Sequence, residues 1–508
     1  MVVRPWARSR APASIPTATA LGSARSQSAW AAAVSAAQSI VSPPPAPPSS
    51  PSSGPSSSPS SSSKGKSPAG SSPFDAIPLV SSDLDHLRGN IMSLLGSGHP
   101  SLDSVAKYYF QAEGKHIRPL IVLLMSAATN GVSPIFAQGP HAGREERDLT
   151  GVDDPLSPKS VLNDYNPSML SGADGNAAAS SSTSTSSAIL PTQRRLAEIA
   201  EMIHVASLLH DDVIDESSLR RGAPSSPSTF GNKLSILGGD FLLGRASVSL
   251  ARLRDNEVVE LLATVIANLV EGEVMQMKGV DASVLEGSGL ASFWSGEKEQ
   301  IAGGIDGAGP TPAHFTSYLQ KTYLKTASLM AKSARAATIL GGCGEGALQQ
   351  WLALRSQSAS PSREEDEALA ARCGAVRDAA YGYGRNLGIA FQLVDDLLDF
   401  RSTSAAFGKP SLGADLRLGL ATAPVLYAWQ EFSGKEHGLG EMVERKFEGP
   451  GDVERALELV HESRGLERTA ELARHHGEMA LKCLEVVEEG EAKAALVRLV
   501  QGVLERVK

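Results

Sequence analysis

LLHDDVID at residues 208–215 is the segment from which both the fold and the chemistry of this chain can be predicted. Asp211 and Asp215 are four residues apart, so on a helix both side chains project from one face. Like charges at that spacing repel by roughly 0.2–0.5 kcal/mol, and the neighbouring apolar residues raise this cost by limiting solvation. A divalent cation reverses the repulsion, because carboxylate oxygens are suitable Mg²⁺ ligands. The segment therefore indicates a helix that carries a metal site.

The same pattern recurs in FQLVDDLLD, residues 391–399. Asp395, Asp396 and Asp399 repeat the spacing in an equally apolar setting. One copy alone is explained equally well as an acidic, solvated helix face, but two such copies are not. Because Mg²⁺ usually completes its coordination shell with substrate phosphates, two carboxylate clusters predict metal ions that hold a polyanion between helices.

Basic residues stand in short motifs before and after the first aspartate segment. GKHIRP at residues 114–119 opens an apolar helix, and Lys115 and Arg118 would lie at its positive end, which favours phosphate binding. Arg220 and Arg221 follow the first aspartate segment closely and suit bidentate phosphate contacts, with ordinary surface charge as the alternative.

A later helical segment carries two lysines on one face. Lys321 and Lys325 are four residues apart, and they either present ammonium groups to a phosphate or form a solvated stripe. His204, seven residues before Asp211, shares the face of that aspartate. A lone histidine on an apolar helix is more often a core residue than a ligand contact, so spacing alone does not assign it.

Together these motifs resemble the trans-isoprenyl diphosphate synthases, and most of all the mitochondrial long-chain polyprenyl diphosphate synthases of ubiquinone biosynthesis. The resemblance covers roughly residues 74–508 and rests on both aspartate motifs and, elsewhere, on GKHIRP, Arg220-Arg221-Gly222, Lys325-Thr326 and Gly408-Lys409-Pro410. It implies a prenyltransferase that depends on Mg²⁺ and adds isopentenyl diphosphate repeatedly to an allylic primer, farnesyl or geranylgeranyl diphosphate.

The resemblance also implies a role for each matching residue. The metal ligands would be Asp211, Asp212, Asp215, Asp395, Asp396 and Asp399. Apart from Asp399, these aspartates would also be catalytic, together with Lys325 and Lys409. The allylic diphosphate would contact Arg220, Lys325, Thr326, Gln392 and Lys409, whereas isopentenyl diphosphate would contact Lys115, Arg118, His204 and Arg221. The released diphosphate, and not a side chain, is the implied proton acceptor.

Composition narrows the fold and the partners. The 508 residues are 42% hydrophobic and 5% aromatic, which fits a Leu- and Ala-rich helical protein. We therefore expect an all-α fold, one large helical bundle with a central cavity. The net charge of −9 argues against nucleic-acid binding. No apolar run reaches eighteen residues, so no transmembrane segment is expected, although peripheral membrane contact is compatible with the sequence.

Residues 1–73 differ in kind from the rest. They contain Arg, Ala and Ser, and the first acidic residue of the chain is Asp75. Such a composition is typical of a mitochondrial transit peptide followed by a disordered Pro/Ser linker, with a merely disordered tail as the alternative. We expect a mitochondrial protein of the matrix, or of the matrix side of the inner membrane.

The polyprenyl synthase domain would then span residues 74–508, with surface insertions at about 131–187, 281–312 and 356–366. We expect the last of these to be a polar loop, and residues 366–400 to form a long helix broken by glycines. No segment shows the alternation that is typical of a strand. The family implies a homodimer, with a homologous second subunit as the alternative.

The length of the product can be argued from the helix before Asp211. Ala206 and Ser207 lie roughly 6–7.5 Å from Asp211 along the axis, at 1.5 Å per residue. Short-chain relatives place aromatic residues there as a floor, so small residues favour a long product, hexaprenyl to decaprenyl. The alternatives are a geranylgeranyl-type synthase, a non-catalytic regulatory subunit and a terpene cyclase, which would leave the Lys115/Arg118 site unexplained.

Overall fold

The structure is a computed structural model that describes residues 78–111, 116–137, 152, 189–220, 222–278, 309–358, 363–401, 412–433 and 437–506. These residues belong to one unit, residues 69–508. The predicted transit peptide and linker lie outside the described residues. Most of the predicted insertions at 131–187 and 281–312 do so as well.

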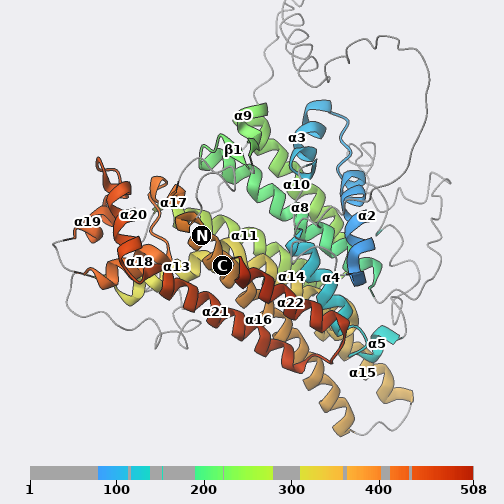
Figure 1. Ribbon diagram of the computed structural model, residues 1–508. Helices are drawn as coiled ribbons and strands as arrows, with labels where there is room; N and C mark the ends of the chain where they lie inside the picture. The colour runs from blue at the N-terminus through green and yellow to red at the C-terminus, as the bar shows by residue number, and fades with distance from the viewer. Residues whose placement is uncertain are drawn as a thin grey trace, which may run out of the picture. The chain divides into compact units, whose positions relative to one another are not determined.

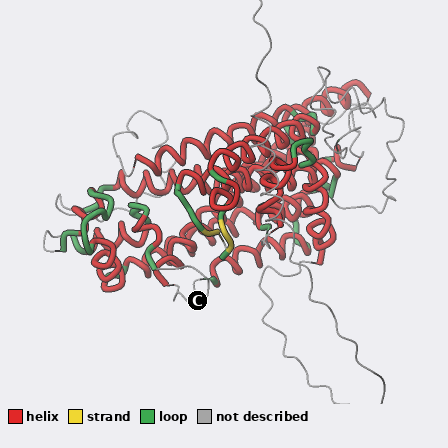
Figure 2. The backbone as a smooth tube through the Cα atoms, turned by 90° about the horizontal axis from the view of Figure 1, so that it is seen from above, coloured by secondary structure: helices red, strands yellow, loops and turns green. Residues whose placement is uncertain are grey.

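The described residues are almost entirely helical, which confirms the predicted all-α class (Figures 1 and 2). In chain order, the elements up to residue 278 are α2 (Pro78–Leu94), α3 (Pro100–Gln111), α4 (Ile117–Thr129), α5 (Pro134–Ala137), α8 (Pro191–Ile214), β1 (Leu219–Arg220), β2 (Ala223–Pro224), α9 (Ser226–Phe230), α10 (Asn232–Arg252) and α11 (Asn256–Lys278). The others are α13 (Pro312–Thr322), η5 (Tyr323–Ala327), α14 (Ser328–Thr338), η6 (Ile339–Cys343), α15 (Glu345–Ser358), α16 (Arg363–Arg401), α17 (Ala414–Arg417), α18 (Ala423–Glu431), α19 (Leu439–Glu444), α20 (Asp452–Glu462), α21 (Gly465–Cys483), η7 (Leu484–Val486) and α22 (Glu491–Glu505).

A small antiparallel hairpin follows the first aspartate motif, although the sequence shows no strand pattern. β1 and β2 pair Leu219 with Pro224 and Arg220 with Ala223 (Figure 2). Two residues per strand are too few for alternation to be visible in a sequence. The hairpin fixes the backbone of Arg220 close to the end of α8.

The bounds predicted for the polar loop, residues 356–366, are too wide, because α15 reaches Ser358 and α16 already begins at Arg363, and residues 359–362 lie outside the described residues. Arg355 pairs with Glu365 at 2.9 Å and with Asp366 at 3.2 Å. Glu and Asp in the first turn favour a helix N-terminus, so the polarity marks the start of a helix and not a loop. Figure 1 shows α15 beside the N-terminal half of α16 at the lower edge of the bundle.

The long helix α16 packs against α14 and α21, and its glycines do not break it. A Cβ at Gly388 would lie 2.6 Å from the Cα of Ala327, and one at Gly384 would lie 2.5 Å from the carbonyl oxygen of Met330. The glycines therefore allow the backbones of the two helices to approach closely. This approach brings the second aspartate motif next to η5.

The element η5 is a π-helical turn, Tyr323–Ala327, between α13 and α14. The N–H of Ser328 donates to the carbonyl oxygen of Tyr323, five residues back. Such turns occur frequently at functional sites because they re-aim side chains without ending the helix. Here the turn contains Lys325 and Thr326, both of which the sequence predicts as substrate contacts.

Burial within the bundle can be described for one long apolar helix and for one histidine of α21. In the described part of the chain, α10 is the one helix whose length and composition would allow it to cross a membrane, and 44% of its most apolar window is buried. The helix packs on α8, α3 and α9 within the bundle. His476 on α21 is only 1% exposed, and its Nδ1 lies 3.0 Å from Asn386 Oδ1 on α16.

Candidate active site

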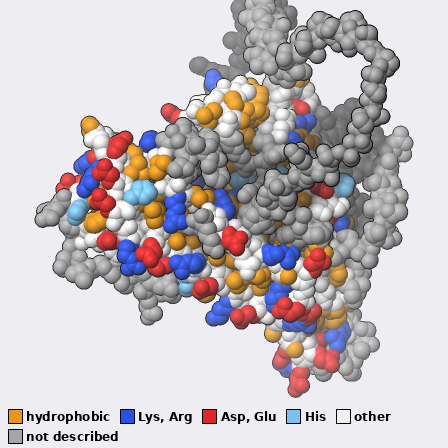
Figure 3. All heavy atoms as spheres, viewed as in Figure 1, with side chains coloured by type: hydrophobic (Ala, Val, Ile, Leu, Met, Phe, Trp, Pro, Cys, Tyr) orange, Lys and Arg blue, Asp and Glu red, His pale blue; other side chains and the backbone are white. Residues whose placement is uncertain are grey.

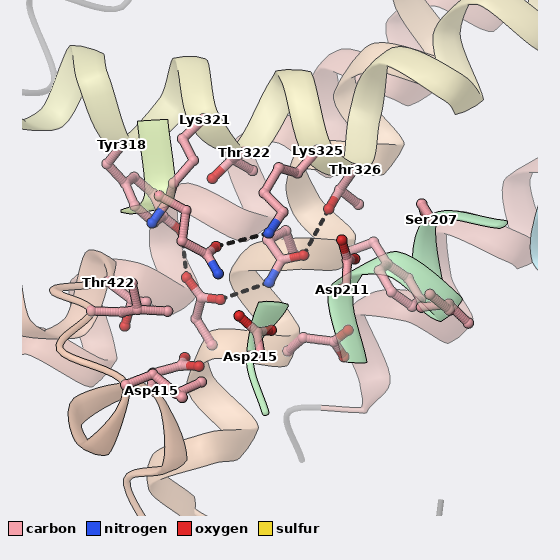
Figure 4. A pocket seen from close by; sticks show the side chains of 18 of the residues that line it. Ser207, Asp211, Asp215, Tyr318, Lys321, Thr322, Lys325, Thr326, Asp415 and Thr422 are labelled. Carbon is pink, nitrogen blue, oxygen red and sulfur yellow. Dashed lines mark hydrogen bonds between the residues drawn. The ribbon is translucent and has the colours of Figure 1, made fainter. Parts of the chain in front are cut away.

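A cavity of about 500 Å³ lies between α8, α13, η5 and α16 and is closed at one end by residues 415–422 (Figure 4). Most of the predicted site residues line it, namely Arg118, His204, Asp211, Asp215, Arg220, Lys325, Thr326, Gln392, Asp395 and Asp396. The two aspartate motifs, 184 residues apart from Asp211 to Asp395, therefore meet at one cavity, as the sequence predicts.

The first motif presents two carboxylates to the cavity from the end of α8. Asp211 and Asp215 are on one face, and the N–H of Asp215 donates to the carbonyl oxygen of Asp211 at 2.8 Å. Burial, followed by the charges of Glu273 and Asp215, raises the pKa of Asp211 to about 7, although Lys325 and Arg220 act against this shift. Burial also raises the pKa of Asp215. Such carboxylates favour a bound cation.

Asp212, the middle residue of the motif, does not line the cavity and has 0% exposure. Arg220 Nε donates to both of its carboxylate oxygens, at 2.8 and 2.9 Å. Tyr109 donates a further hydrogen bond to Asp212, and the N–H of Ser226 donates to the Tyr109 hydroxyl at 2.8 Å. The oxygens of Asp212 are therefore used to hold Arg220 at the cavity wall.

The second motif divides its aspartates in a similar way. Asp396 is 3% exposed and accepts hydrogen bonds from Tyr318 at 2.6 Å and Gln392 at 2.9 Å. Burial raises the pKa of Asp396 to about 6, against the effect of these two donors. Asp399 is outside the cavity lining and accepts the backbone N–H groups of Ala414 and Asp415 at 3.1 and 3.0 Å. Asp399 therefore anchors the start of α17.

Asp395 is the most accessible carboxylate of the second motif, and the C-terminal end of the described chain reaches it. Arg506 Nη2 donates to Asp395 Oδ1 at 2.8 Å, and its guanidinium lies 4.9 Å from the centre of the Phe391 ring. The arginine is thus held by both an ion pair and a cation–π contact. No sequence pattern predicts this contact, because the two residues are 111 positions apart.

Two lysines, Lys321 and Lys325, extend from the wall opposite Asp211 and Asp215 (Figure 4). Lys325 Nζ lies 2.5 Å from Glu273 and 3.0 Å from Gln276 Oε1, both on α11. Thr326 donates to Gln392 at 2.8 Å and so connects η5 to α16. The cavity lining also includes residues that the site prediction omits, namely Tyr318, Lys321, Thr322, Asp415 and Thr422.

Three predicted site residues lie outside the described residues, namely Lys115, Arg221 and Lys409. A second cavity of about 240 Å³ adjoins the first and shares His204, Leu208 and Arg220 with it. His116 and Glu201, 3.0 Å apart, line this second cavity. Two neighbouring spaces with cations at their boundary can receive two anionic ligands side by side.

The carboxylates of the cavity can bind Mg²⁺ only if a substrate's phosphates and waters complete the coordination shell. Among the described residues, no three His, Cys, Asp or Glu side chains converge closely enough to hold a metal ion by themselves. Mg²⁺ characteristically uses one or two carboxylates and takes the rest of its shell from waters and phosphates. Asp211, Asp215 and Asp395 around one cavity can supply such partial shells.

Sequence and structure comparisons agree with this geometry. The profile described as polyprenyl synthetase matches residues 176–357 and 367–460, more than half of the chain. The match is interrupted at residues 358–366, between its two matched parts. The cavity is thus that of a prenyltransferase with the all-α isoprenoid synthase fold. The chain belongs to the polyprenyl synthetase family.

Individual relatives cover most of the chain. The mitochondrial protein named probable hexaprenyl pyrophosphate synthase of Neurospora crassa is 47% identical over 87% of this chain and 84% of its own. The mitochondrial hexaprenyl pyrophosphate synthase of Saccharomyces cerevisiae is 40% identical over 85% of this chain and 90% of its own. The fold resembles that of a Caulobacter crescentus polyprenyl synthase complexed with calcium and isoprenyl diphosphate, at TM-score 0.57 and 24% identity over 86% of this chain and 99% of that one.

Proposed function

We propose that the protein is a long-chain all-trans polyprenyl diphosphate synthase that makes the precursor of the ubiquinone side chain. The observation that carries this proposal is the meeting of Asp211, Asp215 and Asp395 with Lys325 at one cavity. Relatives named hexaprenyl pyrophosphate synthases support a long product. The reaction is the Mg²⁺-dependent condensation of isopentenyl diphosphate with an allylic diphosphate.

The residues divide the work of ionisation among them. Asp211, Asp215 and Asp395 hold the metal ions, with Asp396 beside them, and Mg²⁺, when bound, neutralises the departing diphosphate. Lys325 and Arg220 bind the same diphosphate and stabilise its developing charge. Thr326 and Gln392 position the allylic end. In this proposal Asp212 and Asp399 are not ligands but hold Arg220 and α17 in place.

The second substrate occupies the space next to the allylic diphosphate. Arg118 and His204 line the first cavity, and His204 is shared with the second. We assign isopentenyl diphosphate to this boundary, together with Lys115 and Arg221, and Lys409 to the allylic diphosphate. Holding the double bond near the allylic carbon replaces a bimolecular encounter with an oriented one. No side chain is assigned as the base, because the released diphosphate can accept the proton.

The growing tail leaves the cavity past small residues of α8. Ser207 is half-buried and lines the cavity, and Ala206 behind it is 0% exposed. Both side chains are smaller than the aromatic rings that would form a floor at these positions. This supports a long product over a geranylgeranyl-type one.

The deciding experiment is the chain length made by the purified full-length protein from farnesyl diphosphate, isopentenyl diphosphate and Mg²⁺. We expect products of six to ten isoprene units, and we expect Ser207→Phe to shorten them, since the ring would enter the cavity. Ser207→Ala is the control and should leave the length unchanged. A wild-type product no longer than geranylgeranyl diphosphate would contradict the proposal, and no incorporation at all would favour the regulatory-subunit alternative.

The assembly and the location of the protein are part of the same proposal. Exposed apolar side chains follow one another on α10 and α11, namely Ile236, Leu237, Val270, Val274 and Met277. Figure 3 shows further hydrophobic side chains gathered near α9. Exposed apolar side chains gathered on a surface are typical of an interface, and we propose a homodimer, with a homologous second subunit as the alternative. The relatives named as mitochondrial and the composition of residues 1–73 support a mitochondrial location, and within the mitochondrion we propose the matrix or the matrix side of the inner membrane.

A further inference from the structure

Lys321 is a charged residue of the cavity lining to which the proposed reaction assigns no role. It lies near the end of α13, four residues before Lys325, and both lysines line the 500 Å³ cavity. Figure 4 shows the two side chains extending from the same helix toward the cavity. The sequence allows either a phosphate-binding face or a solvated stripe, and the position of Lys321 at the cavity excludes the solvated stripe.

The two lysines differ in their partners. Lys325 Nζ is held by Glu273 at 2.5 Å and by Gln276 at 3.0 Å. Among the described residues no carboxylate lies within 4.0 Å of Lys321 Nζ, and its nearest defined contact is the Tyr318 ring, with the centroid 5.9 Å away. Lys321 is half-buried, so its ammonium has lost part of its hydration without gaining an ion pair. Such a group is unfavourable unless an anion binds to it.

The carboxylates near Lys321 have other partners. Asp396 is hydrogen-bonded to Tyr318 and Gln392, and Glu273 forms an ion pair with Lys325. Burial lowers the pKa of Lys321, and the more distant charges of Asp396 and Asp415 oppose this effect. These charges partly offset the effect of burial, and the Lys321 side chain extends toward the cavity (Figure 4).

We propose that Lys321 binds the diphosphate of the allylic substrate together with Lys325, as a second ammonium on the same wall. This inference rests on the proposed function of the cavity. Two ammonium groups one helical turn apart can contact different phosphoryl groups of one diphosphate, each by a charge-assisted hydrogen bond. Lys321 thereby contributes to primer binding and to stabilisation of the leaving group.

The test measures binding of inorganic pyrophosphate, with Mg²⁺ present, to the full-length protein by calorimetry. We expect Lys321→Met to weaken this binding about tenfold or more, the usual consequence of losing a hydrogen bond to a charged group. Lys321→Arg should restore most of the affinity. In steady-state kinetics, Lys321→Met should raise the KM for the allylic diphosphate and leave the KM for isopentenyl diphosphate unchanged.

Lys332→Met is the matched control. Lys332 is also half-buried and lies in the adjoining helix α14, but it donates to Thr264 at 2.8 Å and does not line the cavity. Its replacement should leave pyrophosphate binding unchanged. Lys321→Gln serves as a second variant, with folding checked by circular dichroism.

The outcomes separate the two proposals. If wild-type protein binds pyrophosphate and the folded Lys321 variants bind it within twofold of that affinity, the role of Lys321 is wrong. If wild-type protein does not bind pyrophosphate and Mg²⁺ at all, the proposed function of the cavity fails instead. If Lys321→Met tightens Mg²⁺ binding without weakening pyrophosphate, the lysine acts only as a counter-charge for Asp396 and Asp415, which also overturns the inference.

Discussion

Tyr109 shows how one residue outside the aspartate motifs can determine what a motif residue does. Its hydroxyl donates to Asp212 and accepts from the N–H of Ser226. Asp212 in turn binds the Arg220 guanidinium. The tyrosine thus connects α3 to the end of α8 and to the first residue of α9, and Asp212, which is fixed in this way, holds Arg220 at the cavity wall.

We predict that Tyr109→Phe raises the KM for the allylic diphosphate several-fold and changes kcat less. Removing the hydroxyl leaves the Ser226 N–H unpaired and costs roughly 1–3 kcal/mol of stability. It also loosens the Asp212–Arg220 pair. Arg220 must then become ordered when the substrate binds, and this cost lowers the affinity for the allylic diphosphate. Steady-state kinetics at saturating Mg²⁺ and urea unfolding would measure the two effects.

Tyr381→Phe is the control for this prediction. The Tyr381 hydroxyl is 2.6 Å from that of Tyr323, and Tyr381 does not line the cavity. Its loss should affect unfolding alone. An unchanged KM in Tyr109→Phe would show that Asp212 orients Arg220 without help.

At the scale of elements, the contact between α16 and the α13–η5–α14 helix determines where the two walls of the cavity stand. Gly384 and Gly388 permit this contact, because a Cβ at either position would meet backbone atoms closer than 3 Å. Lys325 and Asp395 sit on the two elements that these glycines bring together.

We predict that Gly388→Ala lowers the free energy of unfolding by about 1–3 kcal/mol, the usual cost of overpacking, and reduces activity by separating the walls. Gly374→Ala in the same helix is the control, because its Cβ would meet only the flexible Arg377 side chain at 3.9 Å. The control should be stabilised by about 0.5–1 kcal/mol, since alanine favours a helix. Thermal unfolding and product formation would test both; a Gly388→Ala protein as stable and active as wild type would refute the argument.

The sequence predicts these elements well where a single helix face carries the information. The faces of α8 and α16 follow from spacing alone, which is why Asp211, Asp215 and Asp395 are correctly placed at one cavity. Contacts between distant segments do not follow from spacing. Tyr109 and Asp212 are 103 residues apart, so the sequence offers no reason to separate Asp212 from its neighbours.

At the scale of the whole molecule, the C-terminal end of the described chain contacts the second aspartate motif, which lies in α16. Arg506 follows the last residue of α22 and binds Asp395, so the fold brings the end of the chain to the cavity. The side chains of this pair are 26% and 36% exposed, which makes the ion pair weak enough to exchange. The guanidinium contacts a carboxylate that we propose as a metal ligand, so Arg506 and a metal ion would compete for Asp395.

We predict that Arg506→Ala lowers the Mg²⁺ concentration for half-maximal activity by about two- to fivefold, in line with a partly exposed ion pair. Titration of the full-length protein with Mg²⁺ at fixed substrate would measure it. Arg498→Ala, an exposed arginine in α22, is the control and should not change the requirement. A higher Mg²⁺ requirement in Arg506→Ala would mean that the arginine supports the metal-bound state instead of competing with it.

The π-helical turn at Tyr323–Ala327 has a consequence for how such chains can vary in length. It holds one residue more than an α-helical turn of the same height, so excising a single residue there would leave an unbroken helix. The residues on either side would keep their orientation, because the widened turn already accommodates the extra residue. Lys321 and Tyr318 would still face the reaction space, whereas Lys325 and Thr326 inside the turn would be re-aimed. The molecule would therefore keep its fold and lose contacts to the primer.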